Sequence, residues 1–454
     1  MRIRWLETHI KNQYKMNEDM QRRKSMKNQL QIGILGFGTV GSGVLRILKH
    51  HEPKLNQVTG VTLKAKKVLV RDIEKKRGTI ADDIELTLDA TEIINDSEID
   101  IVVEVMGSID DAKKYIKEAL TAGKHVVTAN KDLIALHGNE LVALAKEHHC
   151  DLYYEASVAG GIPILRTIVD SLASDEIQKV FGIVNGTTNF ILSQMTNEGK
   201  TYDEALKEAQ ELGFAESDPT NDVDGIDAAR KMVILTRLAF GMNVELDQIE
   251  TKGIRNLQLE DIKMAEKLGY KIKLIGSAIQ FDNRVSVDVG PILVPINHPL
   301  AGVQNENNAV FVVGAAVGET MYYGPGAGEL PTANSVVSDV ITVAKNIRLG
   351  TSGNVFSSYQ HETSLAEDTK VSNKYYIAIE MQDKTGQFLA LTKLFSQFDI
   401  GFDQIIQQPL SSDMAKVVIV THKINKAQQK ELVNAFKNTD EMNLMVCFKV
   451  MEGK

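Results

Sequence analysis

A short apolar strand pattern that runs directly into a glycine-rich turn constrains the fold of this chain more than any other feature. Residues 30–35 read LQIGIL, and Gly36, Gly38 and Gly41 follow with the spacing Gly-x-Gly-x-x-Gly before a helical pattern begins. In such a turn the glycines allow a sharp bend and close approach of a ligand, and the N–H groups of the helix start face a pyrophosphate. The pattern therefore predicts a dinucleotide-binding turn.

The alternation of strand and helix patterns predicts how the chain is divided. It continues through residues 29–155, which predicts an α/β, Rossmann-like, doubly wound parallel sheet, with a return segment at about 325–350. Residues 156–324 mix long helical patterns with strands and are expected to form an α+β domain for substrate binding and oligomerisation. Residues 351–373 are rich in Ser, Thr and Gly and form a predicted linker, and residues 374–454 follow the order βαββαβ of a ferredoxin-like module.

Composition limits the class of protein. No uncharged apolar run reaches the length of a transmembrane helix, so no membrane association is expected, and the net charge of -9 argues against a nucleic-acid surface. The only cysteines, Cys150 and Cys447, cannot build a disulfide framework, which favours a cytoplasmic protein. Neither lies at a helix start, so no thioester chemistry is expected and simple hydride exchange between aldehyde and alcohol is favoured.

The first 28 residues differ in kind from the rest. They contain eight Lys or Arg and three acidic residues, without the apolar segment of a secretory signal. We expect residues 1–28 to be a disordered or artefactual extension, with Met26 as a natural start.

The end of the second predicted strand bears on the choice of nicotinamide cofactor. A carboxylate at this place pairs with the ribose 2′-hydroxyl of NAD, whereas Arg accepts the 2′-phosphate of NADP. The strand ends in Arg71 and Asp72, and one residue of register decides which of them faces the ribose. Three further cations follow, which favours NADP(H) over NAD(H); they are Lys75, Lys76 and Arg77.

Two lysines are candidates for chemistry. Lys131 follows a predicted strand in the sequence TANK, at the sheet edge where α/β folds bind ligands, although an exposed lysine is common there. Lys231 ends the acidic stretch 216–231, which resembles a calcium loop until Lys231 stands where a bidentate Glu is required. Asp227 lies four residues before Lys231 on one helix face, so the two form either an ordinary salt bridge or an acid–amine pair that serves hydride transfer.

Five segments carry a resemblance to a known family. In chain order they are ILGFGTVGSG, VVTANKDLIA, YYEASVAGGIPIL, GIVNGTTNFIL and ELGFAESDPTNDVDGIDAARK. They resemble homoserine dehydrogenase, in the monofunctional form because no kinase region is present, and the resemblance runs from about residue 29 to 350. The resemblance implies reversible NAD(P)H-dependent reduction of L-aspartate 4-semialdehyde to L-homoserine, in threonine, methionine and isoleucine biosynthesis.

The resemblance also implies roles for particular residues. Lys231 matches the catalytic acid/base, Lys131 a second lysine near cofactor and substrate, and Glu216 and Asp227 the groups that hold substrate. We expect Asp218, Asp222 and Asp224 to do no more than cap and order the loop. Besides the glycine turn, the positions that match cofactor contacts are Thr39, Val40, Gly107, Gly213 and Gly328.

A sodium site and a regulatory module follow from the same resemblance. Family members bind sodium through main-chain carbonyls, which correspond here to Glu155, Val158, Gly160 and Ile162. The last module resembles an ACT domain, with Thr385 where the family turn has Pro. These features imply an amino-acid effector such as threonine, and family members imply a homodimer or homotetramer.

Two other readings remain open from the sequence. One is a regulatory NADP-binding sensor without catalysis, and the other is a dehydrogenase for a different amino-semialdehyde or hydroxy acid. The presence of Lys231, Asp227 and Glu216 argues against the sensor, and competition between substrates would separate the second reading.

Overall fold

The computed structural model describes residues 27–75, 80, 82–357, 360–439 and 441–452. Its chain divides into two compact units. Unit 1 consists of the described residues up to 133 together with 137–156 and 332–355, and unit 2 consists of 134–136, 157–331 and the described residues from 356 onward. Nearly all of the predicted N-terminal extension, including Met26, lies outside the described residues, as do Lys76 and Arg77.

Unit 1 is built on a six-stranded parallel sheet with the order β3-β2-β1-β4-β5-β6. The first three strands extend the sheet in one direction and β4 returns to the other side of β1, which confirms the predicted doubly wound fold. In such a sheet, ligands bind at the carboxyl ends of the strands where the order reverses. The strands are β1 (Gln29–Leu35), β2 (Thr62–Leu69), β3 (Glu85–Thr87), β4 (Ile99–Glu104), β5 (His125–Thr128) and β6 (Leu152–Tyr153).

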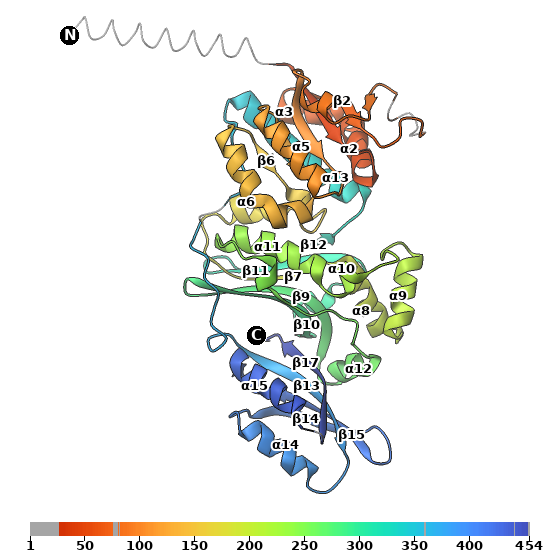
Figure 1. Cartoon of the computed structure of the whole chain (residues 1–454), viewed down its shortest axis with the longest axis vertical. Coiled ribbons are helices and arrows are strands. Elements are labelled where there is room, and N and C mark those ends of the chain that lie inside the picture. The colour runs from red at the N-terminus through yellow and green to blue at the C-terminus, as the bar shows by residue number, and fades with distance from the viewer. Residues whose placement is uncertain (1–26, 76–79, 81, 358–359, 440, 453–454) are drawn as a thin grey trace, which may run out of the picture. The chain divides into compact units, whose positions relative to one another are not determined.

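The central strands of unit 1 are rich in buried apolar residues, as is typical of a parallel sheet covered by helices. The side chains of Ile32, Ile34, Val102 and Val103 are fully buried. Helices of this unit lie around the sheet in Figure 1. They are α2 (Thr39–His50), α3 (Glu52–Thr59), α4 (Thr91–Ile94), α5 (Asp110–Thr121), α6 (Lys131–Glu147) and most of α13 (Glu329–Leu349).

One carboxylate makes several of the hydrogen bonds that hold the return of the chain to unit 1. Asp151 Oδ1 accepts hydrogen bonds from the main-chain N–H groups of Gly353 and Asn354 at 2.7 and 2.8 Å, and its Oδ2 accepts one from Asn346 Nδ2 at 2.9 Å. The return segment therefore covers residues 332–355, slightly later than the expected 325–350.

Unit 2 contains a mixed sheet with the order β12-β11-β7-β9-β10-β17-β13-β15-β14. Two short strands join it at the side, since β8 pairs with β10 and β16 with β13. The strands are β7 (Ile177–Ile183), β8 (Glu250–Thr251), β9 (Tyr270–Phe281), β10 (Arg284–Pro295), β11 (Asn307–Gly314), β12 (Gly318–Pro325), β13 (Ser372–Gln382), β14 (Phe402–Pro409), β15 (Met414–Thr421), β16 (Ile424–Asn425) and β17 (Met442–Val450).

Helices pack on one face of the β7–β9 part of this sheet. An added Cβ at Gly276 would lie 2.4 Å from Met232 Cγ of α11, so this helix approaches the sheet where a side chain is missing. None of the helices in the described part of the chain is long and apolar enough to cross a membrane. The helices of unit 2 are α7 (Ile164–Arg166), α8 (Gly186–Glu198), α9 (Tyr202–Glu211), α10 (Thr220–Val223), α11 (Ile226–Phe240), α12 (Leu259–Lys267), α14 (Gln387–Ser396) and α15 (Lys426–Lys437).

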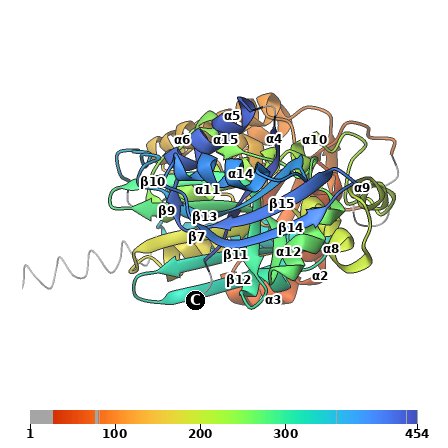
Figure 2. The same ribbon diagram turned by 90° about the horizontal axis from the view of Figure 1, so that it is seen from below.

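The C-terminal module, residues 372–452, has the expected order βαββαβ apart from the short strand β16. Helices α14 and α15 both cover one face of its strands (Figures 1 and 2), and Leu391, Phe395 and Leu432 of these helices are buried in a core with the strand residues Ile377 and Ile419.

The module does not stand apart from the preceding domain, although the sequence predicts a separate one. Ile292 and Leu293 of β10 pair with Lys449 and Val450 of β17 in parallel. The main-chain N–H of Met451 also donates to Leu293 O at 2.8 Å. One sheet therefore runs through both parts, and the contacts place them in a single unit.

Candidate active site

The glycine turn between β1 and α2 requires its glycines at two positions. Gly36 has φ +113°, and an added Cβ there would lie 2.8 Å from Val105 O; one at Gly41 would lie 2.3 Å from Gly36 O. Nothing lies within 4 Å of the corresponding position at Gly38. Helix α2 then begins at Thr39, and its first turn, which includes Val40, carries no acidic residue. The turn is thus tight, open toward a ligand, and suited to an anion.

A cavity of about 780 Å³ adjoins this turn within unit 1. Gly36 and Gly38 line it, and so do Arg71, Asp72 and Lys75 beyond the end of β2. Asp72 Oδ1 accepts a hydrogen bond from the main-chain N–H of Glu74 at 2.8 Å, so this carboxylate orders the turn after the strand. Both candidates for contact with the ribose therefore border the cavity.

A buried carboxylate that the sequence analysis missed organises the carboxyl ends of β4 and β5. Glu104 accepts a hydrogen bond from Thr128 Oγ1 at 2.6 Å and another from the N–H of Met106 at 2.8 Å. Burial raises the pKa of Glu104, and these hydrogen bonds oppose that rise. The sequence signal was an acidic residue at the end of the apolar run IVVEV.

Lys131 is placed by the same network. Asn130 donates from its main-chain N–H to Thr128 Oγ1 at 3.0 Å and from its side chain to Ser108 O at 2.7 Å. The Asn130 side chain also caps α6, by accepting from the N–H of Leu133, so Lys131 is the first residue of the helix. Nearby Gly107 has φ +82° and open space beside it.

Asp227 and Lys231 form a buried ion pair on α11 in unit 2. Their side chains are joined at 2.7 Å between Oδ2 and Nζ, with residue exposures of only 3% and 9%. Lys231 Nζ also donates to the main-chain carbonyl of Val184 at 2.6 Å. This burial excludes the solvated salt bridge that the sequence left open, because such pairs on exposed helices remain hydrated.

Asn185, at the junction of β7 and α8, joins this pair to the acidic loop. Its Nδ2 donates to Asp227 Oδ2 at 2.8 Å and to Asp222 Oδ1 at 2.7 Å. Its Oδ1 accepts from the N–H of Thr188 and caps α8. Asn185 was not among the predicted site residues; the available signal was an Asn before Gly-Thr-Thr at a strand–helix junction, which is an N-cap pattern.

The other acids of the loop lie away from the ion pair. Asp218 Oδ1 accepts from the N–H and Oγ1 of Thr220, and these hydrogen bonds lower the pKa of Asp218. Asp224 pairs with Arg255. Asp218 and Asp224 are thus engaged with neighbouring residues of the loop and with Arg255, whereas Asp222 contacts the site through Asn185. Glu216 is exposed.

Two of the predicted cofactor positions lie in unit 2. Gly213 follows α9 with φ +78°, and Gly328 precedes α13 with φ +116°. Both therefore adopt a left-handed conformation that favours glycine.

The predicted sodium ligands lie on a short irregular stretch of chain. Glu155, Val158 and Ile162 are almost fully buried, and Ala159 and Gly160 have φ values of +53° and +46°. An added Cβ at Gly160 would lie 2.4 Å from Gly326 O. A hard cation prefers oxygen ligands, and irregular backbone can turn several main-chain carbonyls toward one point, so the stretch is compatible with the predicted donor set; the Ile162 carbonyl also accepts from the N–H of Ile164 at 2.8 Å.

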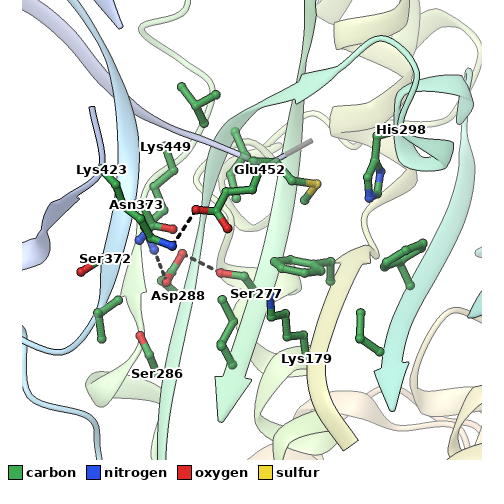
Figure 3. A pocket seen from close by; sticks show the side chains of 18 of the residues that line it. Lys179, Ser277, Ser286, Asp288, His298, Ser372, Asn373, Lys423, Lys449 and Glu452 are labelled. Atoms are coloured by element: carbon green, nitrogen blue, oxygen red, sulfur yellow. Dashed lines mark hydrogen bonds and ion pairs between the residues drawn. The ribbon is translucent and has the colours of Figure 1, made fainter. Parts of the chain in front are cut away.

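A second cavity, of about 300 Å³, lies within unit 2 where the sheet meets the C-terminal module (Figure 3). Ser277 Oγ on β9 donates to Asp288 Oδ1 on β10 at 2.9 Å, and Lys449 of β17 pairs with the same carboxylate. Lys423 and Glu452 of the module form another pair at 2.7 Å on its border. The cavity is polar where the module contributes to it.

The cysteines have no environment that favours a thiolate. Cys150 is buried, and burial raises its pKa to about 11; burial likewise raises the pKa of Cys447 to about 11. A nucleophilic cysteine requires a lowered pKa, so neither thiol is suited to nucleophilic attack.

Comparison with known proteins agrees with this geometry. A family model described as homoserine dehydrogenase matches residues 163–341, and one described as the NAD binding domain of homoserine dehydrogenase matches residues 36–155. A homoserine dehydrogenase of Bacillus subtilis is 50% identical over 406 residues, which are 89% of this chain and 94% of that protein.

Solved structures give the same result. A homoserine dehydrogenase from Thiobacillus denitrificans superposes with a TM-score of 0.88 at 34% identity and covers 93% of this chain and 98% of its own. A hyperthermophilic archaeal homoserine dehydrogenase in complex with NADPH gives a TM-score of 0.60 at 30% identity, over 69% of this chain and 97% of its own. The dinucleotide turn, the buried lysine–aspartate pair and these likenesses lead to one conclusion: the chain belongs to the homoserine dehydrogenase family of NAD(P)-dependent oxidoreductases, which act on a CH–OH group.

Proposed function

We propose that this protein catalyses the reversible reduction of L-aspartate 4-semialdehyde to L-homoserine, in the cytoplasm, for threonine, methionine and isoleucine biosynthesis. One observation carries the proposal: Lys231 is an almost buried ammonium with two of its three N–H groups engaged, by Val184 O and Asp227 Oδ2. Among the described residues no side chain or carbonyl is recorded as accepting the third N–H. That N–H is suited to a substrate oxygen.

Besides the hydride, the reaction requires a proton donor that is held in a fixed position. The nicotinamide, when bound, supplies the hydride that adds to the aldehyde carbon. Lys231 stabilises the negative charge that grows on the aldehyde oxygen and donates the proton that makes it a hydroxyl. In the reverse direction Lys231, as a neutral amine, removes the hydroxyl proton while the carbon loses hydride. Asp227 holds the ammonium in place throughout.

Substrate recognition is assigned to acidic residues because the substrate carries an ammonium group. We propose that Glu216, which is exposed on the loop after α9, pairs with that ammonium, and that Asp227 also contacts the hydroxyl or amino end of the substrate. Lys131 is proposed as a second lysine that contacts cofactor and substrate.

The test of the reaction is the appearance of reduced nicotinamide when the purified protein is given L-homoserine and NADP at alkaline pH. Lys231→Ala is expected to lower kcat by about 10²- to 10⁴-fold and to leave NADPH binding intact, whereas Lys207→Ala, at an exposed position on α9, should match the parent. If the parent protein shows no activity, the remaining interpretation is a regulatory NADP-binding sensor without catalysis. Equal turnover of malate or glycerate would favour a different dehydrogenase.

The residues at the cavity favour NADP(H) as cofactor. Arg71 and Lys75 line the cavity beside Asp72, whose carboxylate already orders the following turn, so the two cations are the better partners for a 2′-phosphate. The other proposed cofactor contacts are Gly36, Gly38, Thr39, Val40, Gly41, Gly107, Lys131, Gly213 and Gly328. Arg71→Ala should raise KM for NADP much more than KM for NAD, and equal changes would contradict this assignment.

We also propose that main-chain carbonyls of Glu155, Val158, Gly160 and Ile162 hold a sodium ion. Among the described residues no group of three His, Cys, Asp or Glu side chains is placed to hold a metal, and carbonyl ligands do not need one. Replacing sodium by a bulky organic cation at constant ionic strength should lower the thermal midpoint, and an unchanged midpoint would contradict the site.

The C-terminal module is proposed as an ACT-like regulatory domain that responds to an amino acid such as threonine. Its fold order and its own core support this assignment. Threonine should inhibit the oxidation of homoserine in the full chain, and complete insensitivity to threonine would refute this choice of effector.

A homodimer or homotetramer is proposed from the uncovered face of the sheet in unit 2. The face opposite α8 and α11 presents Phe181, Val313, Met321 and Tyr323, of which Met321 and Tyr323 are 38% and 54% exposed. A second copy of this chain would remove these apolar groups from water. Light scattering should give two or four chain masses, and a monomer would refute the proposal.

A further inference from the structure

The motif Asn185-Gly-Thr-Thr has no role in the proposed chemistry, yet its first residue contacts more of the site than any other uncharged side chain described above. We infer that Asn185 is a positioning residue, whose carboxamide holds Asp222 and Asp227 in the arrangement that aims Lys231 at the substrate. This inference rests on the proposed function of Lys231.

The orientation of the Asn185 carboxamide is fixed by its neighbours. Its Oδ1 accepts from the N–H and the Oγ1 of Thr188, both at 2.8 Å, while its Nδ2 donates to two carboxylates. A flipped amide would place Oδ1 against Asp222 and Asp227 and its N–H groups against the N–H of Thr188. Only the observed orientation gives every group a partner of the opposite kind.

The same short segment also supplies the second anchor of the catalytic lysine. The carbonyl of Val184, directly before Asn185, accepts from Lys231 Nζ, and Asn185 Nδ2 and Lys231 Nζ share the acceptor Asp227 Oδ2. The end of β7 therefore sets both the direction of the ammonium and the position of its counter-ion. Asn185 is only 4% exposed, so water cannot easily replace its amide.

The first turn of α8 also holds the beginning of the acidic loop. Thr187 Oγ1 donates to Phe214 O at 2.5 Å, at the beginning of the acidic loop, while Asn185 holds Asp222 and Asp227 at its end. The start of α8 thus fixes both ends of the segment that carries Glu216. A loop that is fixed in this way can present carboxylates to the ammonium group of the substrate without losing much conformational freedom on binding.

The charges around Asn185 determine what its replacement does. The elements of unit 2 that meet at this point present Asp222 from α10 and Asp227 and Lys231 from α11. The neighbouring Asp224 is paired with Arg255, and the glycines at 182 and 276 on β7 and β9 lie against Met232 of α11. An acid in place of Asn185 would bring a third carboxylate beside two others, which strengthens the hold on the Lys231 proton.

The decisive variant is Asn185→Asp, because Asp caps a helix as well as Asn does but has no amide to donate. We expect an unchanged thermal midpoint and NADPH affinity, kcat for homoserine oxidation lowered by about tenfold or more, and the rising limb of the kcat–pH profile moved to higher pH. Asn185→Ser, also a good cap, should move the limb in the same direction by less. Asn425→Asp, at the N-cap of α15, is the matched control and should leave both activity and profile unchanged.

The experiment distinguishes failure of the positioning role of Asn185 from failure of the proposed function. If the parent protein does not oxidise homoserine, the function itself falls. If the parent is active and the pH profile of Asn185→Asp coincides with it, the positioning role is refuted, whether or not kcat falls. If Asn185→Asp does not fold, Asn185→Ser is judged by the same criterion.

Discussion

A single lysine in the interior of unit 2 makes the stability of this protein depend on pH in a calculable way. Lys273 on β9 is 3% exposed, and its Nζ donates to Val303 O at 2.5 Å and to Asn189 Oδ1 at 3.1 Å. In the part of the chain that the structure describes, both hydrogen-bond partners of this amine are uncharged. Burial, with a smaller contribution from Lys271, lowers the pKa of Lys273 from 10.5 to about 7.

The sign and size of the effect follow from this pKa. Between about pH 7 and 10.5 the unfolded chain keeps a proton on Lys273 that the folded protein has lost, so the free energy of unfolding rises with pH across this window. The cost of the buried charge is therefore fully present below about pH 7 and disappears toward 10.5. At about 1.4 kcal/mol for each pH unit, the whole window is worth about 5 kcal/mol.

Lys273→Met removes this titration and also two hydrogen bonds. The loss of donors to Asn189 and Val303 costs about 1–3 kcal/mol at every pH, whereas the benefit of removing a buried charge exists only at low pH. The free energy of unfolding of the variant relative to the parent should therefore fall by about 3 kcal/mol between neutral pH and about pH 9.5.

The assay is urea unfolding followed by far-ultraviolet circular dichroism, with parent and variant compared at each pH in the same buffer. Lys263→Met, at an exposed position on α12, is the control and should keep a constant difference from the parent. A difference for Lys273→Met that does not change with pH would refute the reasoning, because it would show that Lys273 does not titrate in this window.

Three further predictions follow from the environments of individual residues. Gly41→Ala should abolish NADPH binding, measured by fluorescence titration, because its Cβ would lie 2.3 Å from Gly36 O; near-normal affinity would show that the turn can relax. Lys416→Ala should destabilise the protein by about 3–5 kcal/mol in thermal unfolding, because it leaves a buried charge unpaired: Asp261, its partner at 2.7 Å, is only 1% exposed. The double variant Lys416→Met with Asp261→Leu should recover much of this loss. If stability is not recovered, the charge argument is contradicted. Treatment with iodoacetamide near neutral pH should leave activity unchanged, because the pKa values of Cys150 and Cys447 are both raised to about 11. Rapid inactivation would show that one of the two thiols is reactive.

Local patterns explain which parts of the structure could be predicted from the sequence. The turn at Gly36, Gly38 and Gly41 lies within a few residues, and its strand–turn–helix context is visible in the same stretch. The pairing of Asp227 with Lys231 follows from the helical period alone. Such features depend on neighbours along the chain, so one sequence is enough to find them.

The parts that were missed depend on contacts between distant segments. Asn185 is 42 residues from Asp227, and nothing in its own surroundings shows that its amide would meet two carboxylates. Glu104 is fully buried, and its partner Thr128 comes from β5, 24 residues further along the chain. In each case the polar residue acts through a partner that the tertiary fold selects.

The continuous sheet of unit 2 has a practical consequence for any attempt to shorten this protein. Met451 is buried with Ile275, Ile292 and Leu300, beside the place where β17 joins β10. A chain cut before β13 would expose this apolar cluster and leave a bare strand edge, which favours aggregation. The role of the C-terminal module should therefore be tested by point substitutions on its surface rather than by truncation.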